Sequence, residues 1–450
     1  MPATSELELG ARAVVAKLQE AGFEALYAGG CVRDRLRNVD PHDYDIATSA
    51  RPEQVQALFR RTVGVGAQFG VICVLDRKME FQVATFRSDG VYQDGRHPES
   101  VVFSDAEEDA RRRDFTINGL FWDPIRQTLR DYVGGEADLK AGILRAIGEP
   151  SERFKEDRLR MLRAIRFATT LGFEIHPDTW TAIVRHAAQL REVSAERIRD
   201  EFVKTMLCPA RVRGLDLLEA SGLLREILPE MEALKGCQQP PQWHPEGDVW
   251  VHTRLMLSLL PEQVSVPLAL SVLLHDIAKP VTYSFDEKAG RIRFSGHEKL
   301  GAEMTEAILC RLRFPRKEID ATVEAVGNHM AFKDVQQMRT SRLKRFLARA
   351  TIEDELVLHR VDCAGSNGDL SNYDFLRAKL AEFSSEPLIP PPLITGKALI
   401  ALGYRPGPQF KEILEHVQTR QLEGALHSAD EALFWVREQF PLPNKADNPD

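Results

Sequence analysis

The sequence predicts an α+β protein in which a small mixed β-sheet near the N-terminus is followed by all-helical domains. Three observations predict this architecture. Short apolar or alternating runs, separated by Gly, Pro and Asp turns, occupy the chain up to residue 148 and are typical of strands. From Ser151 onward the apolar positions recur at helical spacing almost throughout. At 450 residues the chain is too long for one hydrophobic core, so several domains are expected.

The predicted elements follow in chain order. An amphipathic helix at residues 6–21 precedes the expected strands EALYAGG, YDIATS, FGVICVL, MEFQVATFR and QTLRDYV. The expected domains are residues 1–150, 151–236, 244–380 and 385–440. The proline-rich run from Cys237 is expected to be a linker, and the last ten residues, PLPNKADNPD, a disordered tail.

Composition indicates that any nucleic-acid binding depends on local clusters of positive charge. Hydrophobic content of 43% and charged content of 28% are ordinary for a globular protein, and the net charge is −8. Basic clusters do occur, at Arg111–Arg113, at Arg158, Arg160, Arg163 and Arg166, and at Arg342–Arg349. Each cluster alone is also typical of a solvated helix face.

Cysteine usage and the N-terminus indicate a soluble, cytoplasmic protein. The six cysteines form no Cys-x-x-Cys pair, which argues against a zinc ribbon or a disulfide framework. The N-terminus carries acidic residues and lacks the basic start and apolar centre of a signal peptide. No apolar run approaches the length of a membrane span, so no membrane partner is expected. The oligomeric state stays open.

Two glycines near the N-terminus have the pattern of a phosphate-binding turn. A strand that ends at Gly29 and Gly30 and opens a helix lets backbone N–H groups approach a polyphosphate closely. Arg33, one turn into that helix, can add a charge-assisted contact.

Two aspartates on the next strand have the pattern of a metal site. Asp43 and Asp45 point the same way on an extended strand, because side chains alternate along it. Neighbouring carboxylates repel each other, and a divalent cation relieves that cost, so we expect them to bind Mg²⁺. Glu80, on the strand MEFQVATFR, is a candidate third carboxylate. Either this pair or the glycine pair alone is also typical of a tight turn beside a surface strand.

Further motifs follow in an order that is characteristic of one family. They are Arg112-Arg113-Asp114-Phe-Thr-Ile-Asn118, Asp131-Tyr-Val-Gly-Gly135, Glu156-Asp157-Arg158-Leu-Arg160 and Glu196-Arg-Ile-Arg-Asp-Glu-Phe202. Together with Gly29-Gly-Cys-Val-Arg-Asp34 and Asp43-Tyr-Asp45, they make the first 235 residues resemble the bacterial and eukaryotic-type CCA-adding enzymes (tRNA nucleotidyltransferases) and the related bacterial poly(A) polymerases. The resemblance implies a polymerase-β-type nucleotidyltransferase head and a helical nucleotide-selection domain behind it.

The resemblance also implies the reaction and the residues that carry it. The expected reaction adds C and A nucleotides from CTP and ATP to the 3′ end of tRNA without a nucleic-acid template, with the tRNA acceptor arm as partner. Asp43 and Asp45 would bind the catalytic metals, Gly30, Arg33 and Arg113 would hold the triphosphate, and Asp114 and Asn118 would lie near the ribose. The expected nucleotide-binding residues are Gly29, Gly30, Arg33, Arg112, Arg113, Asp114, Asn118, Asp157, Arg160, Arg163 and Arg166.

A physical argument independently favours Asp157 and Arg160 as the pair that reads the base. Three positions apart on one helix, they would share a face. Cytosine and adenine each present an amino donor beside a ring-nitrogen acceptor, which complements a carboxylate and a guanidinium, whereas guanine and uracil present the reverse. The same spacing is also that of an ordinary intrahelical ion pair.

Related reactions remain as alternatives. A poly(A) polymerase typically carries a long basic tail, whereas this chain ends acidic and its pI is about 5.9. An enzyme that adds only CC is expected to lack the flexible segment that Ser88–Ser100 supplies here, with Asp94 and Arg96 available to reshape the pocket from C to A. An enzyme that adds only the terminal A would look nearly the same, so full CCA addition is favoured and A-only addition stays open.

A second set of motifs, rich in His and Asp, follows in the later helical region. They are His244-Pro-Glu-Gly-Asp-Val-Trp-Val-His252, His275-Asp276-Ile-Ala-Lys279, His297-Glu298, Asn328-His329 and His359-Arg-Val-Asp362. Burying an adjacent His-Asp pair on an apolar helix costs free energy unless the pair is partnered or binds a metal. This set resembles the HD phosphohydrolase superfamily, including the HD domain that follows the nucleotidyltransferase core in some bacterial CCA-adding enzymes.

The HD motifs predict a metal centre. His252, His275, Asp276 and Asp362 are the expected core ligands, and His297 and His329 are expected to complete a second metal position. Imidazole with carboxylate suits Mn, Ni, Co or Fe as well as Mg. The expected chemistry is hydrolysis of a phosphomonoester or a 2′,3′-cyclic phosphate, which would repair tRNA ends before nucleotide addition.

Other classes of function also remain. The HD domain can be a metal-free RNA-binding scaffold, or the whole chain can be a phosphohydrolase with a vestigial head or a noncatalytic RNA-binding adaptor. The intact Asp43/Asp45 and Asp157/Arg160 pairs argue against the last two. The segment from Leu393 to Phe410 is expected to close off the HD core, with tRNA contact as the weaker alternative.

Overall fold

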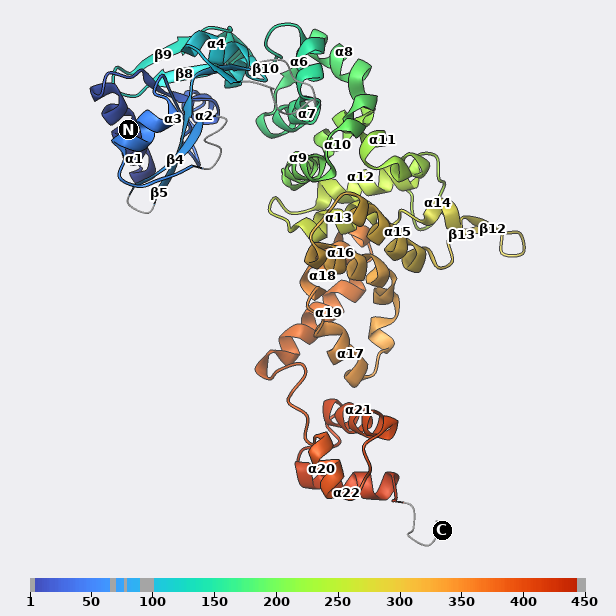
Figure 1. Cartoon of the computed structure of the whole chain (residues 1–450). Helices are drawn as coiled ribbons and strands as arrows, with labels where there is room; N and C mark the ends of the chain where they lie inside the picture. Colours follow the sequence, from blue (N-terminus) through green and yellow to red (C-terminus); the bar gives the residue numbers. More distant parts are fainter. Residues whose placement is uncertain (1–4, 65–69, 77–78, 90–100, 443–450) are drawn as a thin grey trace, which may run out of the picture. The chain divides into compact units, whose positions relative to one another are not determined.

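The computed structural model describes residues 5–64, 70–76, 79–89 and 101–442 (Figure 1). The chain divides into two compact units: unit 1 is Met1–Glu232 with Arg311–Phe314, and unit 2 is Ala233–Cys310 with Pro315–Asp450. The segment 90–100, with the predicted pocket residues Asp94 and Arg96, and most of the predicted disordered tail lie outside the described residues.

Within the described residues, unit 1 contains a seven-stranded mixed sheet in the order β3-β4-β5-β2-β1-β8-β9. The strands are β1 (Ala25–Ala28), β2 (Ile46–Thr48), β3 (Thr62–Val63), β4 (Val71–Asp76), β5 (Met79–Thr85), β8 (Leu120–Asp123) and β9 (Thr128–Asp131). β2 and β5 are parallel and the other neighbours are antiparallel. A small hairpin, β6 (Arg87–Asp89) and β7 (Val101–Phe103), flanks the segment 90–100. The predicted small mixed sheet is confirmed.

Helices pack against this sheet. They are α1 (Glu6–Glu20), α2 (Gly30–Leu36), α3 (Pro52–Leu58), α4 (Ala106–Arg111) and α5 (Gly135–Ala141). Ser5 caps α1, because its hydroxyl accepts a hydrogen bond from the Glu8 N–H at 3.1 Å. Val14, Val15 and Leu18 of α1 are fully buried, so this helix covers part of one face of the sheet.

The rest of unit 1 is helical except for the short parallel pair β10 (Ile143–Leu144) and β11 (Glu174–Ile175). The helices are α6 (Pro150–Glu156), α7 (Leu159–Leu171), α8 (Pro177–His186), α9 (Ala195–Leu207), α10 (Arg211–Ala220) and α11 (Leu223–Ile227). α7 packs against both α9 and α10, and most of its residues are buried. It is therefore the central helix of this region.

Unit 2 is also helical, as predicted, but it includes one unpredicted antiparallel hairpin, β12 (Ser284–Asp286) and β13 (Arg291–Arg293). Its main helices are α12 (Val249–Leu259), α13 (Val266–Leu274), α14 (Lys279–Thr282), α15 (His297–Arg311), α16 (Arg316–Asn328), α17 (Thr340–Leu347), α18 (Ile352–Ala364) and α19 (Ser371–Glu382). Every residue of α13 from Leu268 to Leu274 is buried, because α12, α16 and α18 all pack against it. No helix within the described residues is both long and apolar enough to cross a membrane.

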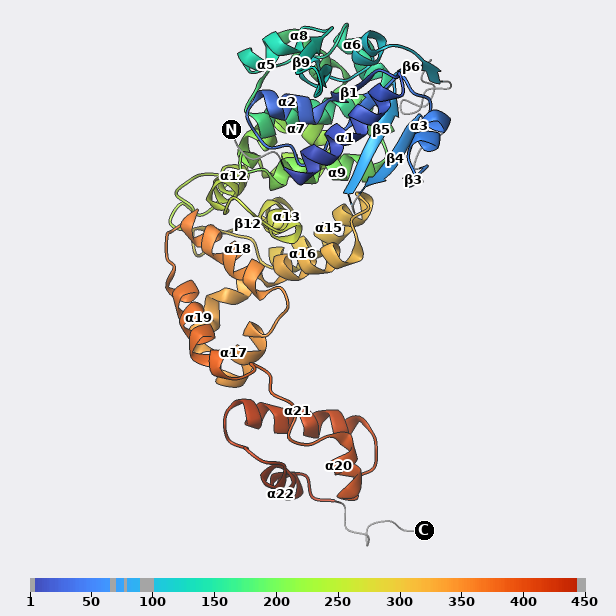
Figure 2. The ribbon, with the colours of Figure 1, turned by 90° about the vertical axis from the view of Figure 1, so that its left-hand side faces the viewer.

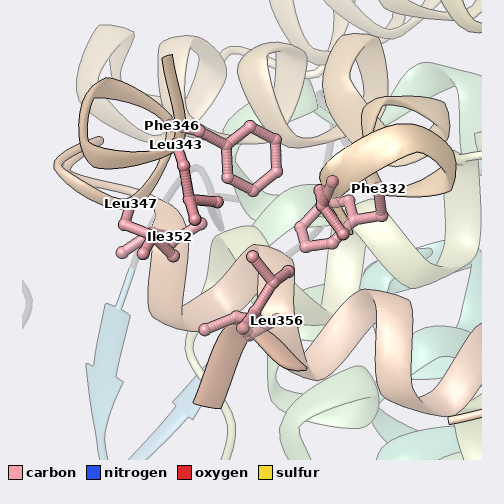
Figure 3. Close-up of a cluster of buried hydrophobic side chains, with 8 residues drawn as sticks. Phe332, Leu343, Phe346, Leu347, Ile352 and Leu356 are labelled. Atoms are coloured by element: carbon pink, nitrogen blue, oxygen red, sulfur yellow. The ribbon is translucent and has the colours of Figure 1, made fainter. Parts of the chain in front are cut away.

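Two further hydrophobic clusters stabilise the C-terminal part of unit 2. In the first, Phe332, Leu343 and Phe346 pack with neighbours from α17 and α18 (Figure 3), and the two phenylalanine rings are 5.0 Å apart. The second is built by the last three helices, α20 (Gly396–Ala401), α21 (Pro408–Leu422) and α22 (Ala429–Gln439) (Figure 2). The C-terminal module therefore has a core of its own.

Gly135 gives a stability prediction, because a Cβ at this position would lie 2.1 Å from the Thr116 carbonyl oxygen. Replacing Gly135 with Ala must displace backbone, and we expect unit 1 to lose about 3 kcal/mol of stability. Thermal or urea unfolding followed by circular dichroism measures the loss. The control is Gly327→Ala, inside α16, where a Cβ meets only the Ala302 methyl group at 3.5 Å. Equal unfolding midpoints for the two variants would contradict the steric argument.

Candidate active sites

The glycine turn of the head connects β1 to α2. Gly29 has φ +71° and ψ −125°, a conformation that favours glycine. Its N–H donates to the Leu120 carbonyl at 3.2 Å. A Cβ on Gly29 would lie 3.1 Å from Nη1 of Arg113, so the glycine turn and this guanidinium are neighbours.

The two predicted metal-binding aspartates immediately precede β2. The Ala28 N–H donates to the Asp45 carbonyl at 2.9 Å, which extends the β1–β2 pairing by one residue. Tyr44 is buried while Asp43 and Asp45 are exposed, so the two carboxylates lie on the same side. Partial desolvation raises the pKa of Asp45, the Asp43 charge raises it further, and Arg113 opposes both. This repulsion fits a site that a divalent cation would complete.

Glu80 shares the exposed side of the sheet. The parallel register pairs Ile46–Thr48 with Val83–Thr85, and Glu80 lies three residues before Val83 in β5. Glu80 is exposed, while its neighbour Phe81 is buried on the opposite face. The role of Glu80 as a third carboxylate stays a prediction.

One buried carboxylate that the sequence analysis missed holds the two adjacent arginines. Asp109 accepts from Arg112 at 2.7 Å and from Arg113 at 2.9 Å. Burial alone would raise the pKa of Asp109, but Arg113 and Arg112 lower it. The sequence spacing could have indicated this contact, because Arg112 and Arg113 follow Asp109 by three and four positions. Residues at these spacings on α4 and its C-terminal turn lie on one face.

A chain of hydrogen bonds connects α2 to α7 through Asp114. Arg33 donates to the Asn118 side-chain oxygen at 2.9 Å, and the Asn118 amide donates to one oxygen of Asp114 at 3.0 Å. The other oxygen accepts two bonds from Arg163, at 2.8 and 2.6 Å. Burial would raise the pKa of Asp114, but Arg163 and the hydrogen bonds lower it to about 2. The structure thus brings four of the predicted nucleotide-binding residues together.

The aromatic ring of Phe167 lies beneath three of the predicted arginines. Arg33 and Arg163 each stand 5.3 Å from its centroid, and Arg166 stands 4.0 Å away. Arg166 also pairs with the buried Glu201 at 2.5 Å. Cation–π contacts and this carboxylate partly offset the mutual repulsion of the three guanidinium groups.

The prediction that Asp157 and Arg160 share one helix is wrong. α6 ends at Glu156, Asp157 is extended with φ −145° and ψ 105°, and α7 begins at Leu159. The Asp157 side chain accepts from the Leu159 N–H at 3.1 Å, which competes with continuing the helix.

The two side chains are instead held by separate partners. Asp157 pairs with Arg197 at 2.8 Å, whereas Arg160 pairs with Glu156 at 2.7 Å. Arg160 also donates to the carbonyls of Arg153, at 3.2 Å, and Arg112, at 3.0 Å. Their orientation therefore comes from tertiary contacts and not from helical spacing.

In unit 2, six predicted metal ligands come from α12, α13 with the turn after it, α15, α16 and α18. Together with neighbouring side chains they form three groups, and within each group the ligand atoms lie within 4.8 Å of one another. The groups are His244, Glu246 and His252; His252, His275 and Asp276; and Asp276, His297 and His329. Asp362 joins the second group, because its Oδ1 lies 3.1 Å from Nε2 of His252. His244 and Glu246 were in the quoted motif but were not predicted as ligands.

Backbone contacts determine which nitrogen of three histidines faces the centre. Nδ1 of His275, His297 and His329 lies 2.9, 2.8 and 2.6 Å from the carbonyls of Val272, Phe294 and Val326, respectively. A carbonyl only accepts, so Nδ1 carries a proton, and in a neutral ring Nε2 presents its lone pair. This is the arrangement of metal-ligating histidines.

His297 and His329 then face each other with unprotonated nitrogens. Their Nε2 atoms are 3.1 Å apart. Burial lowers the pKa of both, and that of His329 falls to about 3, so burial disfavours a second proton on either ring. Two lone pairs at this separation repel each other, and a shared cation removes that repulsion. The donor set therefore fits a metal.

Asp276 lies between the histidine groups. One oxygen is 3.0 Å from Nε2 of His275, and the other is 3.5 and 3.9 Å from Nε2 of His297 and His329. Lys279 pairs with the same carboxylate at 2.6 Å. Burial opposes ionisation, but His275 and Lys279 hold the pKa of Asp276 well below its usual range.

His252 is held between two carboxylates. Its Nδ1 lies 2.6 Å from Glu246, and its Nε2 lies 3.1 Å from Asp362. Burial would lower the pKa of His252, but hydrogen bonds to Asp362 and Glu246 raise it to about 9. In the absence of a metal, a proton on this ring compensates the carboxylates.

Comparisons with known proteins find matches along most of the chain. Family models match for the Poly A polymerase head domain at residues 25–145, for a probable RNA and SrmB-binding site of polymerase A at 172–235, and for an HD domain at 250–362. The CCA-adding enzymes of Latilactobacillus sakei and Levilactobacillus brevis are each 33% identical over 94% of this chain, and the matches cover 95% and 96% of those proteins.

A solved structure has the same fold over nearly the whole chain. It is the Bacillus stearothermophilus CCA-adding enzyme in complex with CTP, which is 27% identical, with a TM-score of 0.72 over 96% of this chain and 98% of that chain. The chain therefore belongs to the CCA-adding enzymes, the nucleotidyltransferases that add CCA to the 3′ end of tRNA.

Proposed function

We propose that Asp43 and Asp45, with Glu80 beside them, form the catalytic centre of the head. Two observations support this proposal: the two aspartates share one exposed side, and the charge of Asp43 raises the pKa of Asp45. When bound, Mg²⁺ would supply Lewis-acid activation of the tRNA 3′-hydroxyl and charge neutralisation of the leaving pyrophosphate. The carboxylates themselves would hold the metals and fix the line of attack.

The triphosphate would lie against the glycine turn and Arg113. Asp109 holds Arg113 beside Gly29, so its position is set before a nucleotide binds. Arg33, whose guanidinium is fixed by Asp34 and Asn118, would contribute a second positive charge. Asp114 would act mainly by orienting Asn118 and Arg163 near the ribose.

Asp157 and Arg160 would read the base of CTP or ATP, although they lie on different elements. Arg197 holds Asp157 and Glu156 holds Arg160, so the carboxylate acceptor and the guanidinium donor are both fixed in direction. A fixed acceptor–donor pair favours cytosine and adenine, because guanine and uracil would leave unpaired buried groups. The structural relative that was solved with CTP supports CTP as one substrate.

The HD domain would remove phosphate from blocked tRNA 3′ ends. Its supporting observation is the 3.1 Å approach of Nε2 in His297 and His329, both of which donate Nδ1–H to backbone carbonyls. His252, His275, Asp276 and Asp362 would hold one metal, and Asp276, His297 and His329 would hold a second. Mn, Ni, Co, Fe or Mg bound there would supply an activated water for hydrolysis of a phosphomonoester or a 2′,3′-cyclic phosphate.

The two activities would act in sequence on the same end of the RNA. A terminal 2′,3′-cyclic phosphate leaves no free 3′-hydroxyl, so nucleotide addition cannot begin until the phosphate is removed. We place both activities in the cytoplasm, in agreement with the six unpaired cysteines.

The product of the head distinguishes the related reactions. The protein is incubated with Mg²⁺, CTP and ATP and a tRNA that ends at the discriminator base, and the 3′ ends are then sequenced. We expect CCA to be added. A second tRNA that already ends in CC is tested in parallel. No addition to the first tRNA together with a single A added to the second would contradict this assignment, and so would long runs of A.

Asp43→Asn tests the metal centre of the head. Removing one of two carboxylates should lower the rate of nucleotide addition by about a thousandfold or more, because metal binding stabilises several kcal/mol of developing charge. Turnover of 2′,3′-cyclic AMP by the HD domain should stay at the wild-type level. Asp40→Asn, at another exposed aspartate nearby, is the matched control for both assays. Retention of nucleotide addition in Asp43→Asn would exclude this residue as a metal ligand.

Glu246→Gln tests the orientation of His252. We expect Mn²⁺ affinity to fall about tenfold, because a carboxylate that accepts from the second nitrogen of a ligand histidine raises its basicity and fixes its direction. Equilibrium dialysis with metal analysis measures this without turnover. Asp276→Asn should reduce Mn²⁺ binding at both positions, and Glu262→Gln, in the loop after α12, should change nothing. Wild-type protein that binds no divalent metal would leave the HD domain as a scaffold.

A further inference from the structure

The hairpin β12–β13 connects α14, which follows the His275-Asp276 motif, to His297 at the start of α15. It projects from the helices of unit 2 (Figure 1). The register pairs Ser284 with Arg293, Phe285 with Ile292 and Asp286 with Arg291. A hairpin of this size has marginal stability in isolation. Its position beside a candidate active site therefore suggests a function in binding the substrate.

The two faces of the hairpin differ in character. Because side chains alternate along a strand, Phe285 and Ile292 share one face, which Tyr283 and Phe294 extend toward the helices. The rings of Tyr283 and Phe294 are 5.9 Å apart. Tyr283 is 47% exposed and Phe285 is 56% exposed, so flat aromatic surface faces solvent. We refer to these four residues as the aromatic face.

The inner end of the aromatic face reaches the metal-ligand cluster. The Phe294 ring lies 6.5 Å from the His297 ring, and its carbonyl accepts the Nδ1–H of His297 at 2.8 Å. The Nζ of Lys279, which pairs with Asp276, lies 5.4 Å from the Phe294 centroid. A chain lying along this face would therefore lead directly to His297 and Asp276.

The charge of the hairpin favours an anionic partner. From Asp286 to Arg293 it has three basic residues and two acidic ones, a net charge of +1, whereas the whole chain carries −8. Arg291 and Arg293 lie on the opposite face from Phe285, with Asp286 between them. Exposed aromatic rings on a hairpin of net positive charge match a single-stranded nucleic acid, whose bases stack and whose phosphates carry negative charge.

We propose that the aromatic face binds the unpaired 3′-terminal nucleotides of RNA by stacking on Tyr283 and Phe285, and so delivers the RNA end to the HD centre. This inference rests on the proposed hydrolase function and specifies its substrate class: the end of a single-stranded RNA, in preference to a free nucleotide. A protein partner or a second copy of this chain is the competing occupant.

Kinetics with two probes test the proposal. One probe is a short RNA ending in a 2′,3′-cyclic phosphate, and the other is 2′,3′-cyclic AMP. Phe285→Ala should lower the ratio of kcat/KM for the RNA to kcat/KM for the mononucleotide by about tenfold, mainly through KM, as expected for the loss of one stack. Phe285→Trp should restore the ratio. Phe434→Ala, at a 64% exposed phenylalanine of α22, is the control and should leave the ratio unchanged.

Phe285→Leu separates stacking from apolar docking. Leucine keeps an apolar surface but has no π face, so the RNA preference should fall as it does in Phe285→Ala. A wild-type ratio in Phe285→Leu would overturn the proposal and assign the aromatic face to a protein partner. An unchanged ratio in Phe285→Ala would also overturn it.

A binding measurement keeps this proposal distinct from the hydrolase function. The short RNA carries 2-aminopurine at its 3′-terminal nucleotide, and stacking quenches its fluorescence without any turnover. If the wild-type protein hydrolyses neither probe, the proposed hydrolase function fails, but quenching that Phe285→Ala abolishes would still support the hairpin site. Equal quenching by wild type and Phe285→Ala would overturn the hairpin site even if hydrolysis occurs.

Discussion

The buried ion pair between Asp114 and Arg163 is the interaction on which the geometry of the head depends. Asp114 is 8% exposed, and its two oxygens are satisfied by Arg163 on one side and by Asn118 on the other. A buried carboxylate is costly unless such partners are present, and removing Arg163 would leave an uncompensated charge. Since Asn118 in turn orients Arg33, one carboxylate sets the positions of two cationic groups.

Buried carboxylates paired with arginines recur elsewhere in the chain. Asp109 holds Arg112 and Arg113, and Glu201 holds Arg166. In each case a buried carboxylate pairs with arginine side chains, which would otherwise repel one another and be mobile. Preorganised cations bind a polyphosphate without a further ordering cost, which is why a protein with a net negative charge can bind an anionic substrate.

The HD centre uses the backbone for the same purpose. Carbonyl groups three residues back accept the Nδ1–H of His275, His297 and His329, and this leaves Nε2 of each ring facing Asp276. Because burial lowers the pKa of His297 and His329, a second proton on either ring is disfavoured, and the convergence of these nitrogens fits a metal site.

The sequence by itself determined the mixed sheet, the helical domains and the family, because motifs such as Asp43-Tyr-Asp45 and His275-Asp276 depend on local strand and helix geometry. Tertiary structure decided what these motifs contact. Asp157 ends a helix by bonding the Leu159 N–H and pairs with Arg197, forty residues away, which no local spacing encodes. Likewise, the role of Glu246 and the aromatic face of β12–β13 appear only when the folded chain brings them to His252 and His297, because long-range packing and not helical period sets those distances.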